Sequence, residues 1–144
     1  MPLPAPEPGL VIGYAYLWRH EVLRGQDHGE KDRPCVIVLS VRHVGGQTVV
    51  TVAPITHSPP DMPELAVELP TGTKRRLGLD SARSWIIASD LNQFVWPGVD
   101  LKPIRRESRD YAYGTLPAAL YREVRDSVLA LAEAGRVRLT RRDG

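Results

Sequence analysis

Short apolar runs separated by turn-forming residues cover most of the chain. Three of these runs are almost continuously apolar or β-branched, which is typical of strands buried on both faces. Residues 64–69 instead alternate polar and apolar side chains, as expected of a half-exposed strand. Gly45 and Gly46 form the expected turn of a hairpin. The predicted strands are residues 10–18, 33–40, 47–55, 64–69, 84–88 and a short one at 92–96.

One segment, from Pro117 to Ala134, has the period of an amphipathic helix. Thr115 is a suitable N-cap for it, and Gly135 is a suitable C-terminal stop. The apolar residues that fall on one side of this helix are Leu120, Val124, Val128 and Leu131. Short strands broken by Gly and Pro, followed by one helix, predict a mainly β fold: a small antiparallel barrel closed by a C-terminal helix.

Length and composition favour a single domain over residues 1–144. Within it we expect a flexible proline-rich leader at residues 1–9 and a loosely held basic tail at 136–144. The single cysteine, Cys35, excludes an internal disulfide. The first residues lack a secretory pattern, and no run approaches the ~18 apolar residues of a spanning helix. We therefore expect a cytoplasmic protein with no membrane partner.

Charge is distributed unevenly along the chain, although the net charge is only +2. Residues 1–70 hold five Lys and Arg against eight Asp and Glu, whereas residues 71–144 hold fourteen against nine. A basic half of this kind is compatible with a polyanionic partner such as nucleic acid, and equally with an ordinary charged surface.

Arg33 and Thr56 are the strongest candidates for chemistry. Arg33 precedes the Gly45-Gly46 turn by about 12 residues and Thr56 follows it by about 10, so the two should lie side by side at the open end of the hairpin. A guanidinium beside a hydroxyl suits a phosphate ligand. The alternative is that Arg33 pairs with Asp32 or Glu30 and only caps the edge of the sheet.

The combination of Arg33-Pro34 before an apolar strand, Pro54-Ile55-Thr56 at a strand end, Ser89-Asp90 after a later strand and a C-terminal helix resembles the MazF/PemK toxins of bacterial toxin–antitoxin systems. The resemblance covers roughly residues 9–134. It implies an SH3-like barrel and a homodimer that cleaves single-stranded RNA without a metal or other cofactor. It also implies an antitoxin partner that silences the enzyme, with Arg33 and Thr56 as catalytic residues.

The general base stays open at this stage. His57 and His28 are candidates by residue type, but a neighbour of Thr56 in a strand points to the opposite face. Asp90 matches an acidic position that lines the cleft in part of the family, and it is equally well explained as a turn residue. Some relatives carry an arginine two residues before this aspartate, where this chain has Ala88.

Several basic and aromatic residues are candidates for RNA binding. A proline-rich turn and a basic cluster precede Arg83, which could also replace the missing arginine beside Asp90. Trp96 is the tryptophan expected to be exposed, whereas Trp18 and Trp85 are expected to pack in the core or a dimer interface. The RNA-binding candidates are Lys31, Lys74, Arg75, Arg76, Arg83 and Trp96.

Two other functions remain compatible with the sequence. One is a toxin of similar fold that grips another protein, as gyrase poisons do, and that would not need the pair Arg33 and Thr56. The other is a non-catalytic SH3-like module that binds RNA or protein. RNA cleavage that depends on Arg33 and Thr56 would separate the toxin enzyme from both.

Overall fold

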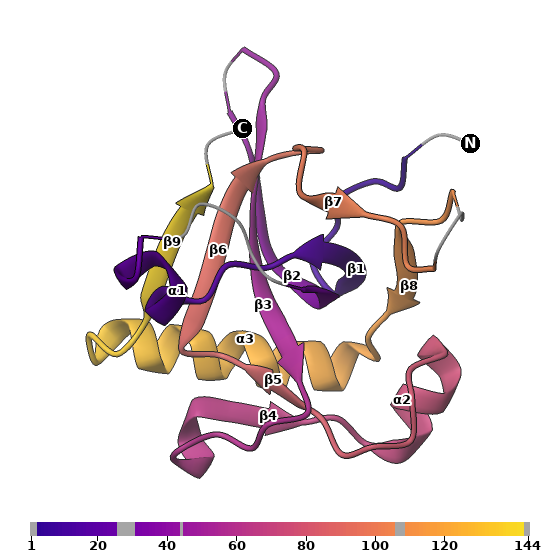
Figure 1. Cartoon of the computed structure of the whole chain (residues 1–144), viewed down its shortest axis with the longest axis vertical. Helices are drawn as coiled ribbons and strands as arrows, with labels where there is room; N and C mark the ends of the chain where they lie inside the picture. Colours follow the sequence, from indigo (N-terminus) through magenta and orange to yellow (C-terminus); the bar gives the residue numbers. More distant parts are fainter. Residues whose placement is uncertain (1–2, 26–30, 44, 106–108, 143–144) are drawn as a thin grey trace.

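The computed structural model describes residues 3–25, 31–43, 45–105 and 109–142. Within these ranges the chain forms nine strands and three α-helices, arranged as Figure 1 shows. The strands are β1 (Leu10–Ala15), β2 (Asp32–Arg42), β3 (Thr48–Thr56), β4 (Ala66–Glu68), β5 (Trp85–Ile87), β6 (Asp90–Val95), β7 (Leu101–Lys102), β8 (Ala112–Thr115) and β9 (Arg138–Arg142). The helices are α1 (Arg19–Leu23), α2 (Thr71–Leu77) and α3 (Ala118–Glu133), with a 3-10 turn at Pro63–Leu65.

The hairpin of β2 and β3 is the centre of the sheet. Strand β1 pairs antiparallel with the outer edge of β2, and β6 and β5 pair antiparallel with successive parts of β3. The neighbours β7 and β8 lie against β1, and β4 lies against β5. Among the residues that the structure describes, no pair of strands closes the sheet into a ring, so the sheet is open. The prediction of a small, mainly β fold with a C-terminal helix is confirmed.

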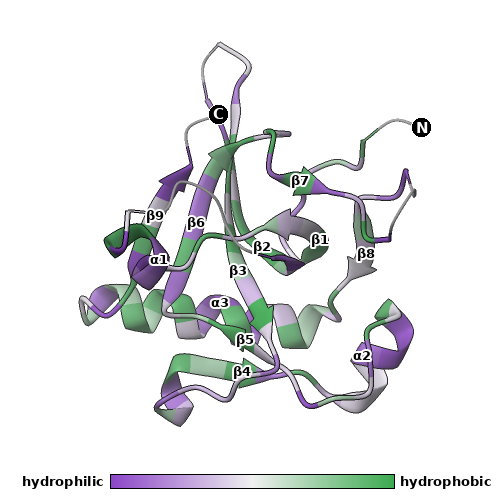
Figure 2. Cartoon of the chain, viewed as in Figure 1, coloured by the Kyte–Doolittle hydropathy of each residue, from purple (hydrophilic) through white to green (hydrophobic). Residues whose placement is uncertain are grey.

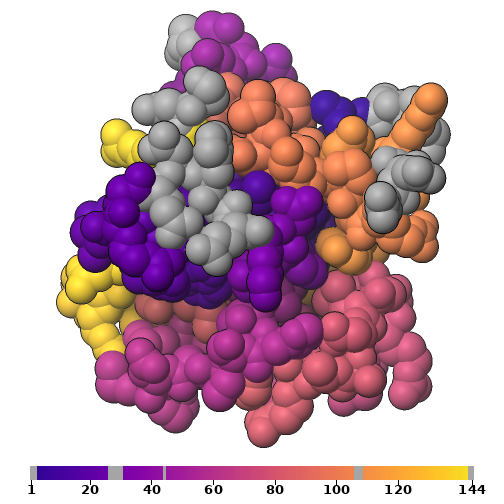
Figure 3. Space-filling model, viewed as in Figure 1, coloured from indigo at the N-terminus to yellow at the C-terminus, as the bar shows by residue number. Residues whose placement is uncertain are grey.

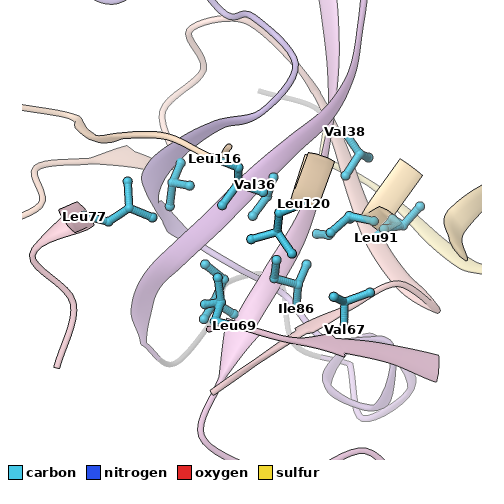
Figure 4. Packing of buried hydrophobic residues seen from close by; sticks show 13 residues of the cluster. Val36, Val38, Val67, Leu69, Leu77, Ile86, Leu91, Leu116 and Leu120 are labelled. Atoms are coloured by element: carbon cyan, nitrogen blue, oxygen red, sulfur yellow. The ribbon is translucent and has the colours of Figure 1, made fainter. Parts of the chain in front are cut away.

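Strands β2 and β3 are buried on both faces, which explains their continuous apolar runs. Val36 and Ile55 face a core that α3 covers, as the close view in Figure 4 shows for the labelled Val36. Cys35 and Val52 face a second core on the opposite side of the same strands. The alternation follows from the two-residue period of a strand. Along β2 and β3, alternate side chains therefore face alternate sides of the sheet, including those at the ends of the strands.

Helix α3 lies across one face of the sheet (Figure 1) and presents the predicted stripe to it. Leu120, Val124 and Leu131 are buried, and Val128 packs against the same core. Figure 2 shows the expected mixture on this helix, with apolar residues interrupted by polar ones. The amphipathic pattern thus identified both the helix and its buried side.

The sequence pattern was wrong about several smaller elements. The described residues contain three helices instead of one, because α1 and α2 are too short to show a helical period. Strand β1 ends at Ala15 instead of residue 18, and the expected strand at 64–69 is a 3-10 turn followed by β4. The sheet is also not wholly antiparallel, because β9 runs parallel to β6.

The basic tail is the largest correction. We expected residues 136–144 to be loosely held, yet Arg138–Arg142 form β9 along β6. Figure 2 shows that this strand is largely hydrophilic, which is why its sequence looks like a solvated end. Its last residue, Arg142, is only 7% exposed and donates hydrogen bonds to the carbonyl oxygen of Ala15 and the side-chain oxygen of Asn92.

Candidate active site

Strand register brings Arg33 and Thr56 together. Cys35 pairs with Pro54, and continuing the same register by two residues sets Arg33 opposite Thr56. Directly opposed residues of an antiparallel pair point to the same face of the sheet. Both side chains line one open cleft of about 520 Å³. The expected neighbourhood of these two residues is therefore present in the structure.

Four segments form the walls of this cleft. In Figure 3 the indigo segment around α1 lies above the magenta segment that follows β3. The remaining walls come from the start of β2 and from the β5–β6 corner. The lining residues are Tyr16, Trp18, His20, Glu21, Lys31, Arg33, Thr56, Ser58, Pro59, Pro60, Asp61, Leu65, Ile87, Ser89 and Asp90.

The Arg33 guanidinium has unused hydrogen-bonding capacity. Its central carbon lies 5.1 Å from the centroid of the Trp18 ring, a cation–π contact that fixes its position. Its Nε is buried and has no hydrogen-bond partner among the described residues. The structure records no ion pair with Asp32, and Glu30 lies outside the described residues. A buried donor without a partner is costly unless a ligand satisfies it.

Thr56 is the last residue of β3 and pairs with Trp85 on its other side. Its Oγ1 accepts a hydrogen bond of 3.1 Å from the backbone N–H of Ser58. Because a hydroxyl both donates and accepts, its hydrogen remains available to an acceptor in the cleft. Arg33 and Thr56 thus offer donors of two kinds to one place.

Asp90 supplies a carboxylate to the same cleft. Its Oδ1 accepts a hydrogen bond of 2.6 Å from the hydroxyl of Tyr16, and its Oδ2 accepts one of 3.2 Å from the backbone N–H of Arg19. Burial raises the pKa of Asp90, whereas these two hydrogen bonds and the nearby charge of His20 act in the opposite direction. The result is a fixed carboxylate that is more basic than an exposed aspartate.

The corner between β1 and α1 carries Trp18 and His20 to the cleft. Asn92, which is fully buried, donates to the carbonyl oxygen of Leu17 at 2.8 Å and accepts from its N–H at 3.0 Å. Glu21 accepts a hydrogen bond of 2.9 Å from the N–H of Trp18. The rings of Trp18 and His20 stack with centroids 6.2 Å apart and planes 17° apart. Polar contacts therefore hold the backbone of Leu17 and Trp18 in place, and the His20 ring stacks on Trp18.

Sequence reasoning missed this corner. Trp18 was assigned to core or dimer packing because it follows an apolar run, and His20 was not considered. The one local signal was Glu21, three residues after Trp18, which is the spacing of a helix capping box. Trp18 does pack against the core that contains Cys35 and Val52, as expected, but it is only half-buried and also lines the cleft.

A sequence model of one protein family matches residues 20–131, and its description is PemK-like, MazF-like toxin of type II toxin–antitoxin system. The chain belongs to this family. The match includes Arg33, Thr56 and Asp90 but begins after Trp18 and ends before β9. No curated protein and no solved structure matches the chain.

Of the two candidate histidines of this MazF-like chain, His57 does not line the cleft. His57 turns away from it, and its Nε2 lies 3.0 Å from Oδ1 of Asp80 at an exposed position. This follows the strand alternation that separates His57 from Thr56. His28 lies outside the described residues. Lys31, by contrast, is exposed at the rim of the cleft, near Arg33.

The basic cluster of α2 lies outside the residues that line the cleft, and its members differ. Lys74 is buried, and its ammonium donates to the carbonyl oxygens of Ala82 at 2.7 Å and Ser81 at 3.4 Å. These bonds make Lys74 a structural residue, contrary to our expectation of an RNA contact. Arg76 donates to the carbonyl oxygen of Thr115 at 3.2 Å, and Arg75 is exposed.

Arg83 and Trp96 also have protein partners. Arg83 donates two hydrogen bonds of 2.8 Å to the carboxylate of Glu68, and its guanidinium lies 5.0 Å from the centroid of the Trp85 ring. It does not line the cleft and so does not stand in for the arginine that some relatives have two residues before Asp90. Trp96 is half-buried and lies against Phe94, with ring centroids 6.1 Å apart.

Within the described residues, no group of three His, Cys, Asp or Glu side chains is arranged to hold a metal ion. In the same part of the chain, no helix has both the length and the apolar composition needed to cross a membrane.

Proposed function

We propose that this chain is the toxin of a type II toxin–antitoxin pair and acts as an endoribonuclease on single-stranded RNA. The observation that carries the proposal is the convergence of Arg33 and Thr56 in one cleft, where the buried Nε of Arg33 has no partner among the described residues. A phosphodiester is the ligand that a guanidinium fork and a hydroxyl bind best together.

The proposed reaction is an internal attack by the ribose. The 2′-oxygen forms a bond to the adjacent phosphorus, the bond from phosphorus to the 5′-oxygen breaks, and a 2′,3′-cyclic phosphate remains. Arg33 stabilises the negative charge that grows on the phosphoryl oxygens, and Thr56 donates a hydrogen bond to one of them. Asp90 accepts the proton of the 2′-hydroxyl. The step needs proton transfer and charge stabilisation, which side chains supply without a metal.

The cleft suits an unpaired strand because its wall includes a half-buried indole. The Trp18 ring lines the cleft beside Arg33, so a base next to the scissile phosphate can stack on it. Lys31 at the rim provides a positive charge for the backbone. DNA would bind but would not be cut, because it lacks the 2′-hydroxyl.

Other RNA contacts extend the proposal beyond the cleft. Arg75 and Arg76 lie on α2 with exposed side chains and remain candidates for phosphate contacts. Lys74, Arg83 and Trp96 are left out: Lys74 is buried, both ends of the Glu68 carboxylate engage Arg83, and Trp96 packs against Phe94. We further propose one domain, a homodimer, a cytoplasmic location and an antitoxin that covers the cleft.

The test compares two Arg and Thr pairs on the same two strands. Arg33→Ala and Thr56→Ala should each slow cleavage of a mixed-sequence RNA in EDTA by about 10²–10³-fold. The controls are Arg42→Ala and Thr48→Ala, because Arg42 and Thr48 pair at the opposite end of the same hairpin. These should cut at the wild-type rate and give a 2′,3′-cyclic phosphate.

The proposal fails if purified wild-type protein leaves such RNA intact, or if Arg33→Ala or Thr56→Ala keeps the control rate. Intact RNA together with inhibited gyrase would indicate a toxin that grips a protein. Tight RNA binding without product, unchanged in Thr56→Ala, would indicate a binding module.

A further inference from the structure

The cleft contains an imidazole that no step of the proposed reaction uses. Within the described residues, His20 is the only histidine that lines the cleft. Its side chain is exposed at the rim, and its ring stacks on Trp18, with 6.2 Å between the centroids. The same Trp18 ring supports the guanidinium of Arg33. One indole therefore positions both the phosphate-binding group and an imidazole.

The reaction requires a second proton transfer. Breaking the bond from phosphorus to the 5′-oxygen leaves an alkoxide unless an acid protonates that oxygen. Asp90 is occupied with the first transfer, because it accepts the proton of the 2′-hydroxyl. An imidazolium is the side chain that gives up a proton most readily near neutral pH.

Three other groups that line the cleft, Tyr16, Glu21 and Lys31, fit this role poorly. Burial raises the pKa of Tyr16 far above its ordinary value, and its hydroxyl already donates to Asp90. Glu21 is buried and accepts a hydrogen bond from the N–H of Trp18. Lys31 is an exposed ammonium, which is a weaker acid than an imidazolium.

We propose that His20 is the general acid of the cleavage, an assignment that rests on the proposed endoribonuclease function. The Nδ1 or Nε2 proton of its imidazolium passes to the 5′-oxygen as the bond to phosphorus breaks, while Asp90 takes the proton of the 2′-hydroxyl. One proton enters the leaving strand and one leaves the ribose, so the step balances. His20 returns to the imidazolium by taking a proton from water.

Hydrogen bonds fix the backbone on the N-terminal side of His20. The backbone N–H of Arg19, the residue before His20, donates a hydrogen bond of 3.2 Å to Oδ2 of Asp90. This bond links the segment that carries the proposed general acid to the proposed general base. The side chain of Asn92 holds the segment before His20 through hydrogen bonds with the backbone N–H and the carbonyl oxygen of Leu17. The proton donor and the proton acceptor are thus supported by the same strand, β6.

The test uses an RNA in which sulfur replaces the 5′-bridging oxygen at the cleavage site. A thiolate leaves without protonation, so the loss of a general acid matters only for the oxygen substrate. His20→Ala and His20→Gln should cut the oxygen RNA about 10²–10⁴-fold more slowly than wild type and should cut the sulfur RNA at nearly the wild-type rate. The matched control is His43→Ala, at an exposed position of the β2–β3 turn.

Three outcomes would overturn the assignment. Equal losses on the two substrates would place His20 in binding or in deprotonation of the 2′-hydroxyl. Wild-type rates for both His20 variants on the oxygen RNA would remove His20 from the reaction. If wild type cuts neither RNA, the proposed function itself is wrong and the assignment falls with it. Equal melting temperatures of wild type and variants exclude a folding defect as the cause of any loss.

Discussion

Replacing Arg142 should destabilise the protein strongly, although the sequence pattern predicts that this residue belongs to a solvent-exposed tail. The side chain of Arg142 is 5% exposed. Its Nη1 donates to the carbonyl oxygen of Ala15 at 2.8 Å and to Oδ1 of Asn92 at 3.0 Å, and its Nη2 lies 3.0 Å from the carboxylate of Asp100. Its guanidinium also lies 5.6 Å from the centroid of the Tyr14 ring. Arg142→Ala removes all four contacts.

The size of the effect follows from the burial of both charges. Removing one partner of a buried ion pair costs about 3–5 kcal/mol, because the other charge stays desolvated and unpaired. The side chain of Asp100 is 18% exposed, so water partly solvates its carboxylate and the lower end of this range applies. For a domain of this length, a loss of about 3 kcal/mol lowers the melting temperature by about 6–12 °C.

The measurement is urea or thermal unfolding, followed by tryptophan fluorescence. Arg141→Ala is the matched control, because Arg141 is the exposed neighbour on the same strand. The double variant Arg142→Met, Asp100→Leu removes both charges and should recover part of the lost stability. If Arg142→Ala melts at the same temperature as Arg141→Ala, the buried position of Arg142 and the pairing of β9 with β6 are wrong.

Three further predictions address the predicted site residues. His57→Ala should keep the wild-type cleavage rate, because His57 faces Asp80; a strong loss in an RNA cleavage assay would restore it to the cleft. Lys74→Met should lower the free energy of unfolding by about 1–3 kcal/mol, measured by denaturation, without weakening binding in an RNA-binding assay. The control, Arg75→Met, should leave stability unchanged in the same denaturation assay. Asp90→Asn should abolish cleavage. Burial raises the folded-state pKa of Asp90 above its unfolded value. The charged carboxylate therefore lowers the stability of the wild type at neutral pH. This cost disappears as the pH falls through the folded and then the unfolded pKa. The stability of Asp90→Asn relative to wild type should therefore decrease from pH 7 to about pH 4, as measured by denaturation at each pH.

The neighbourhood of Arg33 and Thr56 could be predicted because both positions are set within one hairpin. Arg33 lies about two residues further from the Gly45-Gly46 turn than Thr56 does, so counting alone does not place them directly opposite each other. The structure absorbs part of the difference in a β-bulge between Ile37 and Leu39, after which Cys35 pairs with Pro54. Local turn chemistry and strand alternation were sufficient for this part of the cleft.

The corner of β1 and α1 could not be predicted because its supports are distant and polar. Leu17 is held by Asn92, which is 75 residues away in the sequence, and Ala15 is held by Arg142, which is 127 residues away. A buried asparagine or arginine has no signature in hydrophobic periodicity, since the pattern assigns polar residues to the surface. Trp18 and His20 depend on that corner, so their place in the cleft was hidden as well.

The cleft concentrates groups whose burial costs free energy. Among the described residues the Nε of Arg33 has no partner, and Asp90 keeps a desolvated carboxylate; neither group contributes to stability as it stands. Arg33 is held by its contact with Trp18. Asp90 is held by hydrogen bonds from Tyr16 and from the backbone of Arg19. A fold selected for stability alone would satisfy that guanidinium and hydrate that carboxylate. Their retention in one cleft is consistent with the proposed phosphodiester site, where the substrate would supply an acceptor and replace water.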